Sequence, residues 1–140
     1  MRYLIVFLAL MFSLNTQAFE IRVADKMTYD VVKADTREKL ERGLMFVKEM
    51  PENKGMWFDF RAYGKPDMWM KNTFIPLDML FIGCDLKVKD IYENAEPLSL
   101  KRISTDEDFC YVVEVNGGES AKRGLQIGDK VSIIFKNKTM

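Results

Sequence analysis

The sequence predicts an α+β fold, a small barrel-like domain of mainly antiparallel β-strands with one or two short helices. Its apolar segments are short, rich in β-branched and aromatic residues, and bounded by turn residues, which is typical of strands. Helical patterns are confined to two short segments. Neither an internal repeat nor a long linker divides the sequence, so we expect residues 19–140 to form a single domain.

The first part of this domain predicts a hairpin followed by a helix. Residues 19–23 and 28–34 have strand composition and are separated by a polar turn. Residues 36–45 are rich in helix-forming residues, with Asp35 as the expected N-cap. Gly43 indicates where this helix ends.

The remainder predicts further strands and a second short helix. The expected strands are residues 56–60, 67–70, 77–82, 87–92, 109–115 and 131–135. Pro76 interrupts sheet pairing just before one of them. The turn Asn116-Gly117-Gly118 precedes the helical segment 119–124.

Residues 1–18 have the pattern of a secretory signal peptide. Arg2 precedes an apolar run at residues 4–12, and Ala18 is a suitable small residue for cleavage. The run is shorter than the roughly 20 apolar residues that span a bilayer. We therefore expect cleavage after Ala18, a periplasmic or secreted protein, and no transmembrane segment in the mature chain.

The two cysteines, Cys84 and Cys110, both lie downstream of this segment. Disulfides persist in oxidising compartments, whereas cytosolic thiols are kept reduced. Each cysteine is at the edge of a predicted strand, where a bridge between strands is feasible. A Cys84–Cys110 disulfide is the expectation, with two unrelated buried thiols as the alternative.

A polar group lies within the most apolar part of the sequence, residues 55–82. Buried polar side chains are costly unless they are paired. One interpretation is a cleft in which these residues bind a ligand, with Trp69 as a stacking wall. The candidate ligand-binding residues are Trp69, Lys71, Asn72, Thr73, Asp78 and Glu114.

The other interpretation is that the same residues stabilise the fold. Asn72 and Thr73 then satisfy a tight turn, Asp78 accepts hydrogen bonds from backbone amides, and Glu114 pairs with Arg42 or Lys71. The sequence leaves both interpretations open.

Many short motifs, in order along the chain, resemble the domain-of-unknown-function 192 family. They are Glu41-Arg42-Gly43-Leu44-Met45, Gly55-Met56 with Phe58 and Phe60, Trp69-Met70-Lys71-Asn72-Thr73, Ile75-Pro76-Leu77-Asp78 with Leu80-Phe81-Ile82, Val113-Glu114-Val115, Gly118, and Gly128-Asp129 with Val131. The resemblance implies a compact, β-rich bacterial or archaeal domain that is secreted or membrane-associated. It implies no established activity and no catalytic residue, and the cysteines are not part of the pattern.

The composition excludes several classes of function. The chain has no histidine, which excludes the usual Ser-His-Asp and Cys-His catalysis and imidazole-based zinc sites. Lys+Arg and Asp+Glu number 21 each, so the formal net charge is zero and no nucleic-acid partner is expected. We also expect no cofactor.

The favoured function is a non-catalytic module that binds a small molecule, a glycan or an envelope protein through the cleft around Trp69–Thr73 and Asp78. One alternative is an envelope hydrolase that uses Asp78 or Glu114 as acid or base, with Lys71 stabilising negative charge. A weaker alternative is Cu(I) binding by methionine sulfur, because Met68 and Met70 lie on one face of a predicted strand.

Overall fold

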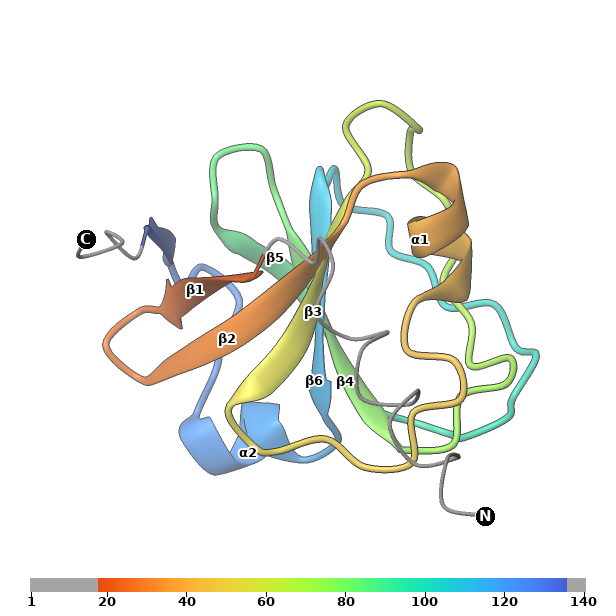
Figure 1. Cartoon of the computed structure of the whole chain (residues 1–140). Helices are drawn as coiled ribbons and strands as arrows, with labels where there is room; N and C mark the ends of the chain where they lie inside the picture. Colours follow the sequence, from red (N-terminus) through yellow and green to blue (C-terminus); the bar gives the residue numbers. More distant parts are fainter. Residues whose placement is uncertain (1–17, 136–140) are drawn as a thin grey trace, which may run out of the picture.

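The computed structural model of the chain describes residues 18–135, so the predicted signal peptide lies outside the described residues except for Ala18. The elements in this part of the chain are β1 (Ala18–Val23), β2 (Met27–Ala34), α1 (Arg37–Arg42), β3 (Lys54–Asp59), β4 (Leu77–Ile82), β5 (Val88–Ala95), β6 (Tyr111–Asn116), α2 (Glu119–Arg123) and β7 (Val131–Ile134). Figure 1 shows α1 and α2 on different sides of the central strands.

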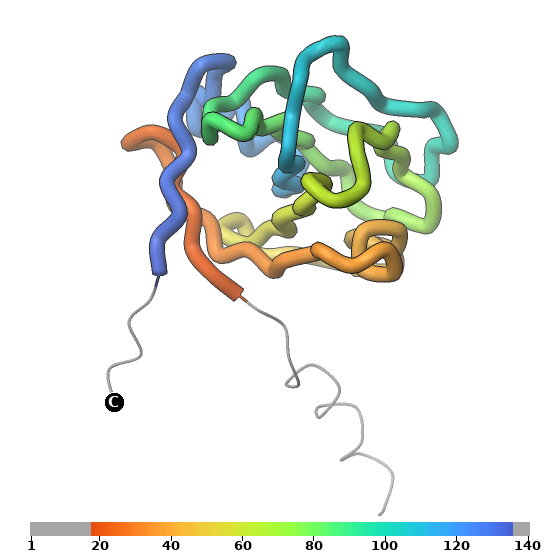
Figure 2. Tube along the Cα trace, turned by 90° about the horizontal axis from the view of Figure 1, so that it is seen from above, coloured from red at the N-terminus to blue at the C-terminus, as the bar shows by residue number. Residues whose placement is uncertain are grey.

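The strands form one sheet in the order β5-β4-β6-β3-β2-β1-β7. Every adjacent pair is antiparallel except β2 and β3, which are parallel. The sheet curls, as the view in Figure 2 illustrates, and its two edges meet at a bridge between Lys87 and Lys130. The predicted α+β class with a mainly antiparallel, barrel-like sheet is therefore confirmed.

Some predicted boundaries were wrong, because local hydrogen bonding decides where elements begin and end. The N-cap of α1 is Thr36, whose side chain accepts a hydrogen bond from the backbone of Lys39, and not Asp35. Gly43 ends the helix with a positive φ, so α1 is shorter than predicted. Residues 67–70 form no full strand; Met68 makes an isolated bridge with Ile103.

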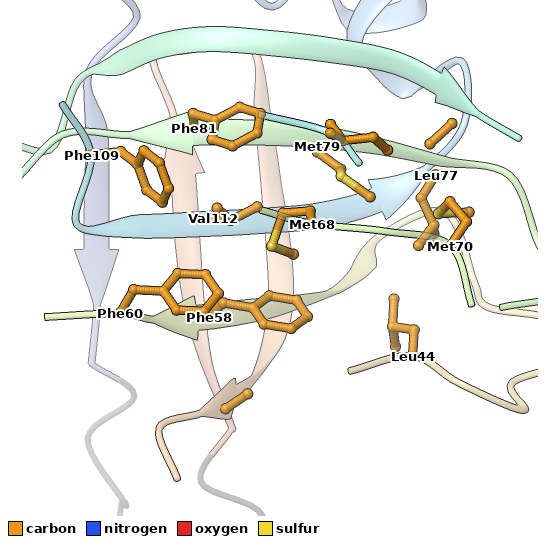
Figure 3. Close-up of a cluster of buried hydrophobic side chains, with 13 residues drawn as sticks. Leu44, Phe58, Phe60, Met68, Met70, Leu77, Met79, Phe81, Phe109 and Val112 are labelled. Carbon is orange, nitrogen blue, oxygen red and sulfur yellow. The ribbon is translucent and has the colours of Figure 1, made fainter. Parts of the chain in front are cut away.

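Two apolar clusters lie on opposite faces of the central strands. The barrel core fills the concave side of the curled sheet and contains Ile21, Val23, Tyr29, Val31, Trp57, Leu80, Ile82, Val88, Val113, Val115, Leu125 and Val131. The outer core lies between β3, β4 and β6 and the segments that cover them, and contains Ala34, Leu44, Phe58, Phe60, Met68, Met70, Leu77, Met79, Phe81, Ala95, Ile103, Phe109 and Val112 (Figure 3). Strand β4 is consequently buried on both faces.

The Cys84–Cys110 disulfide is present, as predicted, with the two Cα atoms 5.1 Å apart. Cys84 follows β4 and Cys110 precedes β6, and the backbone amide of Cys110 donates to the carbonyl of Ile82. The bridge therefore ties together the ends of two central strands. A disulfide stabilises a fold mainly by restricting the conformations of the unfolded chain, and removal of this bridge would lift that restriction.

Candidate functional site

A pocket of about 370 Å³ opens into the outer core beside α1. This volume is at the lower end of the range of ligand-binding pockets. Its interior is formed by buried and half-buried residues: Leu40, Gly43, Leu44, Met45, Phe58, Phe60, Pro66, Met68, Thr73 and Glu114. Its rim is formed by exposed residues: Arg37, Glu41, Arg42, Tyr63, Asp67, Trp69 and Lys71.

Helix α1 and the residues just after it supply one wall. Leu40 and Glu41 lie three and four residues after Arg37, and Leu44 lies four and three residues after them, so these side chains share one face, which lines the pocket. The helix must end close to β3, because a Cβ atom on Gly43 would lie 3.1 Å from the Phe58 ring. With a φ of 49°, this position also favours glycine.

The opposite wall is an extended segment that crosses the outer core. The bridge between Met68 and Ile103 fixes its alternation, so Met68 and Met70 are buried while Trp69 is 45% exposed. The ammonium of Lys71 lies 5.1 Å from the centre of the Trp69 ring, a cation–π distance. Trp69 and Lys71 thus form one continuous part of the rim.

Glu114 on β6 is the buried carboxyl group of the pocket, with 4% of its surface exposed. No described residue forms a hydrogen bond or ion pair with its side chain, including Arg42 and Lys71. Burial in apolar surroundings raises the pKa of Glu114 to about 8, because the charged form loses its hydration. At neutral pH this carboxyl group is mostly protonated and able to donate a hydrogen bond.

Asp78 is also fully buried, but it faces the other side of the sheet. In the register between β4 and β6, Asp78 pairs with Val115 and Met79 pairs with Glu114. Since successive side chains of a strand point to opposite faces, the carboxyl groups of Asp78 and Glu114 lie on opposite faces. The structure therefore does not bring together the pair of acids that the hydrolase alternative requires.

The Asp78 carboxylate holds the start of α2. It accepts hydrogen bonds from the backbone amides of Gly118 at 3.1 Å, Ser120 at 2.8 Å and Asn94 at 2.9 Å. Gly118, the N-cap residue of α2, has no side chain that could cap the helix, so Asp78 performs this function from a neighbouring strand. Asp78 does not line the pocket.

Asn72 and Thr73 form a turn beside the pocket. Asn72 has a φ of 53°, a left-handed conformation that asparagine tolerates, and its carbonyl accepts from the amide of Phe46. The Thr73 hydroxyl donates to the carbonyl of Lys71 at 3.1 Å. Thr73 lines the pocket and Asn72 does not. Of the six candidate residues, the pocket brings together Trp69, Lys71, Thr73 and Glu114.

The rim carries cations that have no carboxylate partner. Among the described residues, Arg37, Arg42 and Lys71 form no salt bridge. The Arg42 guanidinium instead lies 5.7 Å from the centre of the Phe46 ring. Asp67, an acidic residue of the rim, is 3.6 Å from Arg102, which does not line the pocket.

The methionines of the Cu(I) alternative lie within the outer core. Met68 and Met70 are both buried and pack with Phe58, Leu77 and other apolar side chains, as Figure 3 shows. Within residues 18–135, no group of three or more Cys, Asp or Glu side chains is arranged to hold a metal ion. Likewise, the described part of the chain contains no helix long and apolar enough to cross a membrane.

Comparison with known proteins identifies the family of this chain. The model of the domain-of-unknown-function 192 family, DUF192, described as an uncharacterized ACR, matches residues 19–133. The chain belongs to the DUF192 family. No functionally curated protein is significantly similar to it.

Two crystal structures are similar over most of their length. One is a protein of unknown function from Novosphingobium aromaticivorans DSM 12444, with 32% sequence identity and a TM-score of 0.81, covering 86% of this chain and 88% of the other. The second, described as a putative transcription regulator, is from Sinorhizobium meliloti 1021. It has 37% identity and a TM-score of 0.78, covering 85% of this chain and 95% of the other.

Several motifs by which the sequence resembles the DUF192 family converge on the pocket. Residues 41–45, at the end of α1 and just after it, line the pocket, as do Trp69, Lys71 and Thr73 of the stretch 69–73 and Glu114 of β6. Sequence reasoning did not include the α1 wall in the site. The signal for it was the shared helical face of Arg37, Leu40 and Glu41, which resembled an ordinary solvent-exposed helix.

Proposed function

We propose that this DUF192 protein is a non-catalytic binding module and that the pocket beside α1 takes a small, mostly apolar molecule. The observation that carries the proposal is Glu114, a buried carboxyl group that lines the pocket and has no partner among the described residues. Polar groups in protein interiors are nearly always hydrogen-bonded, and a ligand that enters the pocket can supply a partner to the Glu114 carboxyl group.

The lining supports binding more than catalysis. Ligand pockets are typically apolar with a few polar groups that fix orientation, and this interior has Glu114 and Thr73 among aliphatic and aromatic side chains. A carboxylate pair for hydrolysis would require a second acid beside Glu114, whereas Asp78 faces the barrel core.

We also propose that the protein acts outside the cytosol, after it has been exported. The Cys84–Cys110 disulfide supports an oxidising compartment, and the pattern of residues 1–18 supports a cleaved signal peptide. Fractionation of cells that express the whole chain checks this part. We expect a periplasmic or secreted protein that begins at Phe19, and a cytosolic protein that retains Met1 would contradict it.

The similarity to the Sinorhizobium protein, a putative transcription regulator, raises nucleic-acid binding as another function. A protein that binds nucleic acid needs a clustered cationic surface. This chain has equal numbers of basic and acidic residues, and many of its lysines and arginines form salt bridges. We therefore propose no nucleic-acid partner.

A pocket-filling variant tests the binding function. In Leu40→Trp a larger side chain occupies the pocket, and Lys39→Trp is the matched control because Lys39 lies on the same helix outside the lining. The probes are hexan-1-ol, phenol and N-acetylglucosamine, measured by ligand-observed NMR and by the melting temperature.

We expect the two apolar alcohols to bind wild type and Lys39→Trp and to raise their melting temperatures, since a ligand of the native state stabilises it. Leu40→Trp should lose this binding while remaining folded. Equal binding to Leu40→Trp, or no binding of either alcohol to wild type, would contradict the proposal.

A further inference from the structure

The pocket has a distinct arrangement of charge between its rim and its interior. Arg37, Arg42 and Lys71 are exposed at the rim, whereas Glu114 is buried. Most of the other side chains that line the interior are apolar, among them Leu44 and Phe58. A ligand that matches the pocket must therefore change in polarity along its length.

The cations of the rim are available to a ligand. None of the three is neutralised by a carboxylate of the described residues. Two of them lie near aromatic rings, Arg42 at Phe46 and Lys71 at Trp69, and these contacts orient the side chains without using their N–H donors in salt bridges. Guanidinium and ammonium groups bind carboxylate and phosphate oxygens by charge-assisted hydrogen bonds.

The acidic groups of the rim do not cancel the preference of the rim for an anionic ligand. Asp67 is close to Arg102, and Glu41 alone remains to offset three cations. A ligand amine would have to pass these cations to reach Glu114. The titratable groups that face the pocket from α1 and from the opposite segment are Arg37, Glu41, Arg42, Tyr63, Asp67 and Lys71; the described lining from β3 adds only apolar side chains.

We infer that the ligand is a small amphiphilic anion, whose oxyanion head group binds Arg37, Arg42 and Lys71 and whose apolar body lies between α1 and β3. This inference rests on the proposed binding function and specifies its ligand class. At the inner end, the neutral Glu114 side chain donates a hydrogen bond to a hydroxyl or carbonyl oxygen of the ligand. Carboxylate and phosphate head groups share the required chemistry.

The test compares probes that have the same apolar body and different head groups: hexanoate, hexyl phosphate, hexylamine and hexan-1-ol. Binding is measured by titration calorimetry and by the fluorescence of Trp69, which is at the rim, whereas the other tryptophan, Trp57, is buried in the barrel core. We expect at least one anion to bind about tenfold more tightly than hexan-1-ol, and hexylamine to bind more weakly than the alcohol. The two anions distinguish a carboxylate site from a phosphate site.

Charge-removing variants show where the head group binds. Arg42→Gln and Lys71→Gln should each weaken binding of the preferred anion about three- to tenfold, with no change for hexan-1-ol. Lys130→Gln is the control, because Lys130 is an exposed cation at the junction of β5 and β7 and does not line the pocket. Unchanged anion affinity in both rim variants would overturn the inference.

The pH dependence of hexanoate binding tests the contribution of Glu114. Ionised Glu114 repels an anion, so affinity should fall as the pH rises from 6.5 to 9, and Glu114→Gln should abolish this fall. In addition, 6-hydroxyhexanoate should bind wild type more tightly than hexanoate does at pH 6.5. Equal affinity of the two compounds would overturn the assigned contact with Glu114.

The outcomes separate the ligand class from the binding function. If hexylamine or hexan-1-ol binds as tightly as both anions, and Leu40→Trp abolishes that binding, the pocket binds ligands but the anionic class is wrong. If none of the four probes binds wild type, the proposed binding function fails with it.

Discussion

Asp78 and Glu114 are buried acids on neighbouring strands, and a shift of one residue in register separates their surroundings. Asp78 faces the barrel core and accepts three backbone hydrogen bonds that hold the start of α2. Glu114 faces the outer core, lines a pocket and has no partner among the described residues. Burial of an acid therefore does not by itself indicate a functional site. Its hydrogen-bond partners within the fold distinguish a structural acid such as Asp78 from a candidate site residue such as Glu114.

The pH dependence of stability should distinguish the two acids most strongly. The pKa of Glu114 rises from 4.5 to about 8 on folding, so the native state holds a proton that the unfolded state releases. The contribution of Glu114 to the free energy of unfolding should therefore be greatest below pH 4.5 and fall as the pH rises through about 8, by up to about 5 kcal/mol. Urea unfolding of wild type and Glu114→Gln between pH 5 and pH 9 measures this.

The variant isolates the contribution of Glu114, because glutamine stays neutral over this range. The chain also has no histidine to titrate there. Glu114→Gln should be more stable than wild type at pH 9 and similar at pH 5. The same slope in both proteins would show that Glu114 is solvated or paired in solution.

Replacing Asp78, the acid that accepts three backbone hydrogen bonds, should have the next largest effect on stability. Asp78→Ala leaves three buried or half-buried amides without an acceptor and should destabilise the protein by about 4 kcal/mol. Asp78→Asn keeps one carbonyl oxygen and should cost roughly half as much. Both values come from urea unfolding at pH 5, where Glu114→Gln is the matched control with an expected change of less than about 1 kcal/mol. A small loss in Asp78→Ala would mean that water replaces the carboxylate.

A third prediction concerns the register that separates the two acids. Replacing both Cys84 and Cys110 by serine should reduce the free energy of unfolding by about 3 kcal/mol, through the entropy of the unfolded chain. The difference in pH dependence between this protein and its Glu114→Gln form should persist, because the β4–β6 hydrogen bonds still fix which face each acid occupies. Loss of that difference would show that the bridge itself maintains the register.

The smallest effect is expected at the rim. Trp69→Ala removes a side chain that is 45% exposed, and the free energy of unfolding should change by less than about 1 kcal/mol. Ligand binding to the pocket should nevertheless weaken, which calorimetry with the preferred hexyl probe measures. A large loss of stability would place Trp69 with the fold-supporting residues and not with the site.

The sequence was sufficient for all the predicted strands except residues 67–70, because apolar patterns and turn residues are local signals. It was insufficient for the difference between Asp78 and Glu114, since that difference depends on pairing between strands about 35 residues apart in the chain. Trp69 and Lys71 were recognisable as site candidates from their polar and aromatic character. Leu40 and Gly43 were not, because their position in the pocket depends on how α1 packs against β3.

The parallel alignment of β2 and β3 has a consequence for how this protein can change. Two adjacent parallel strands cannot be joined by a tight turn, so the chain must leave the sheet and return, and here that crossover carries α1. One side of the pocket is thus formed by a crossover that lies outside the sheet, whereas Phe58 and Glu114 belong to the sheet itself. Exchanging residues 35–53 for another crossover of equal span would therefore change the lining of the pocket without redesigning the sheet.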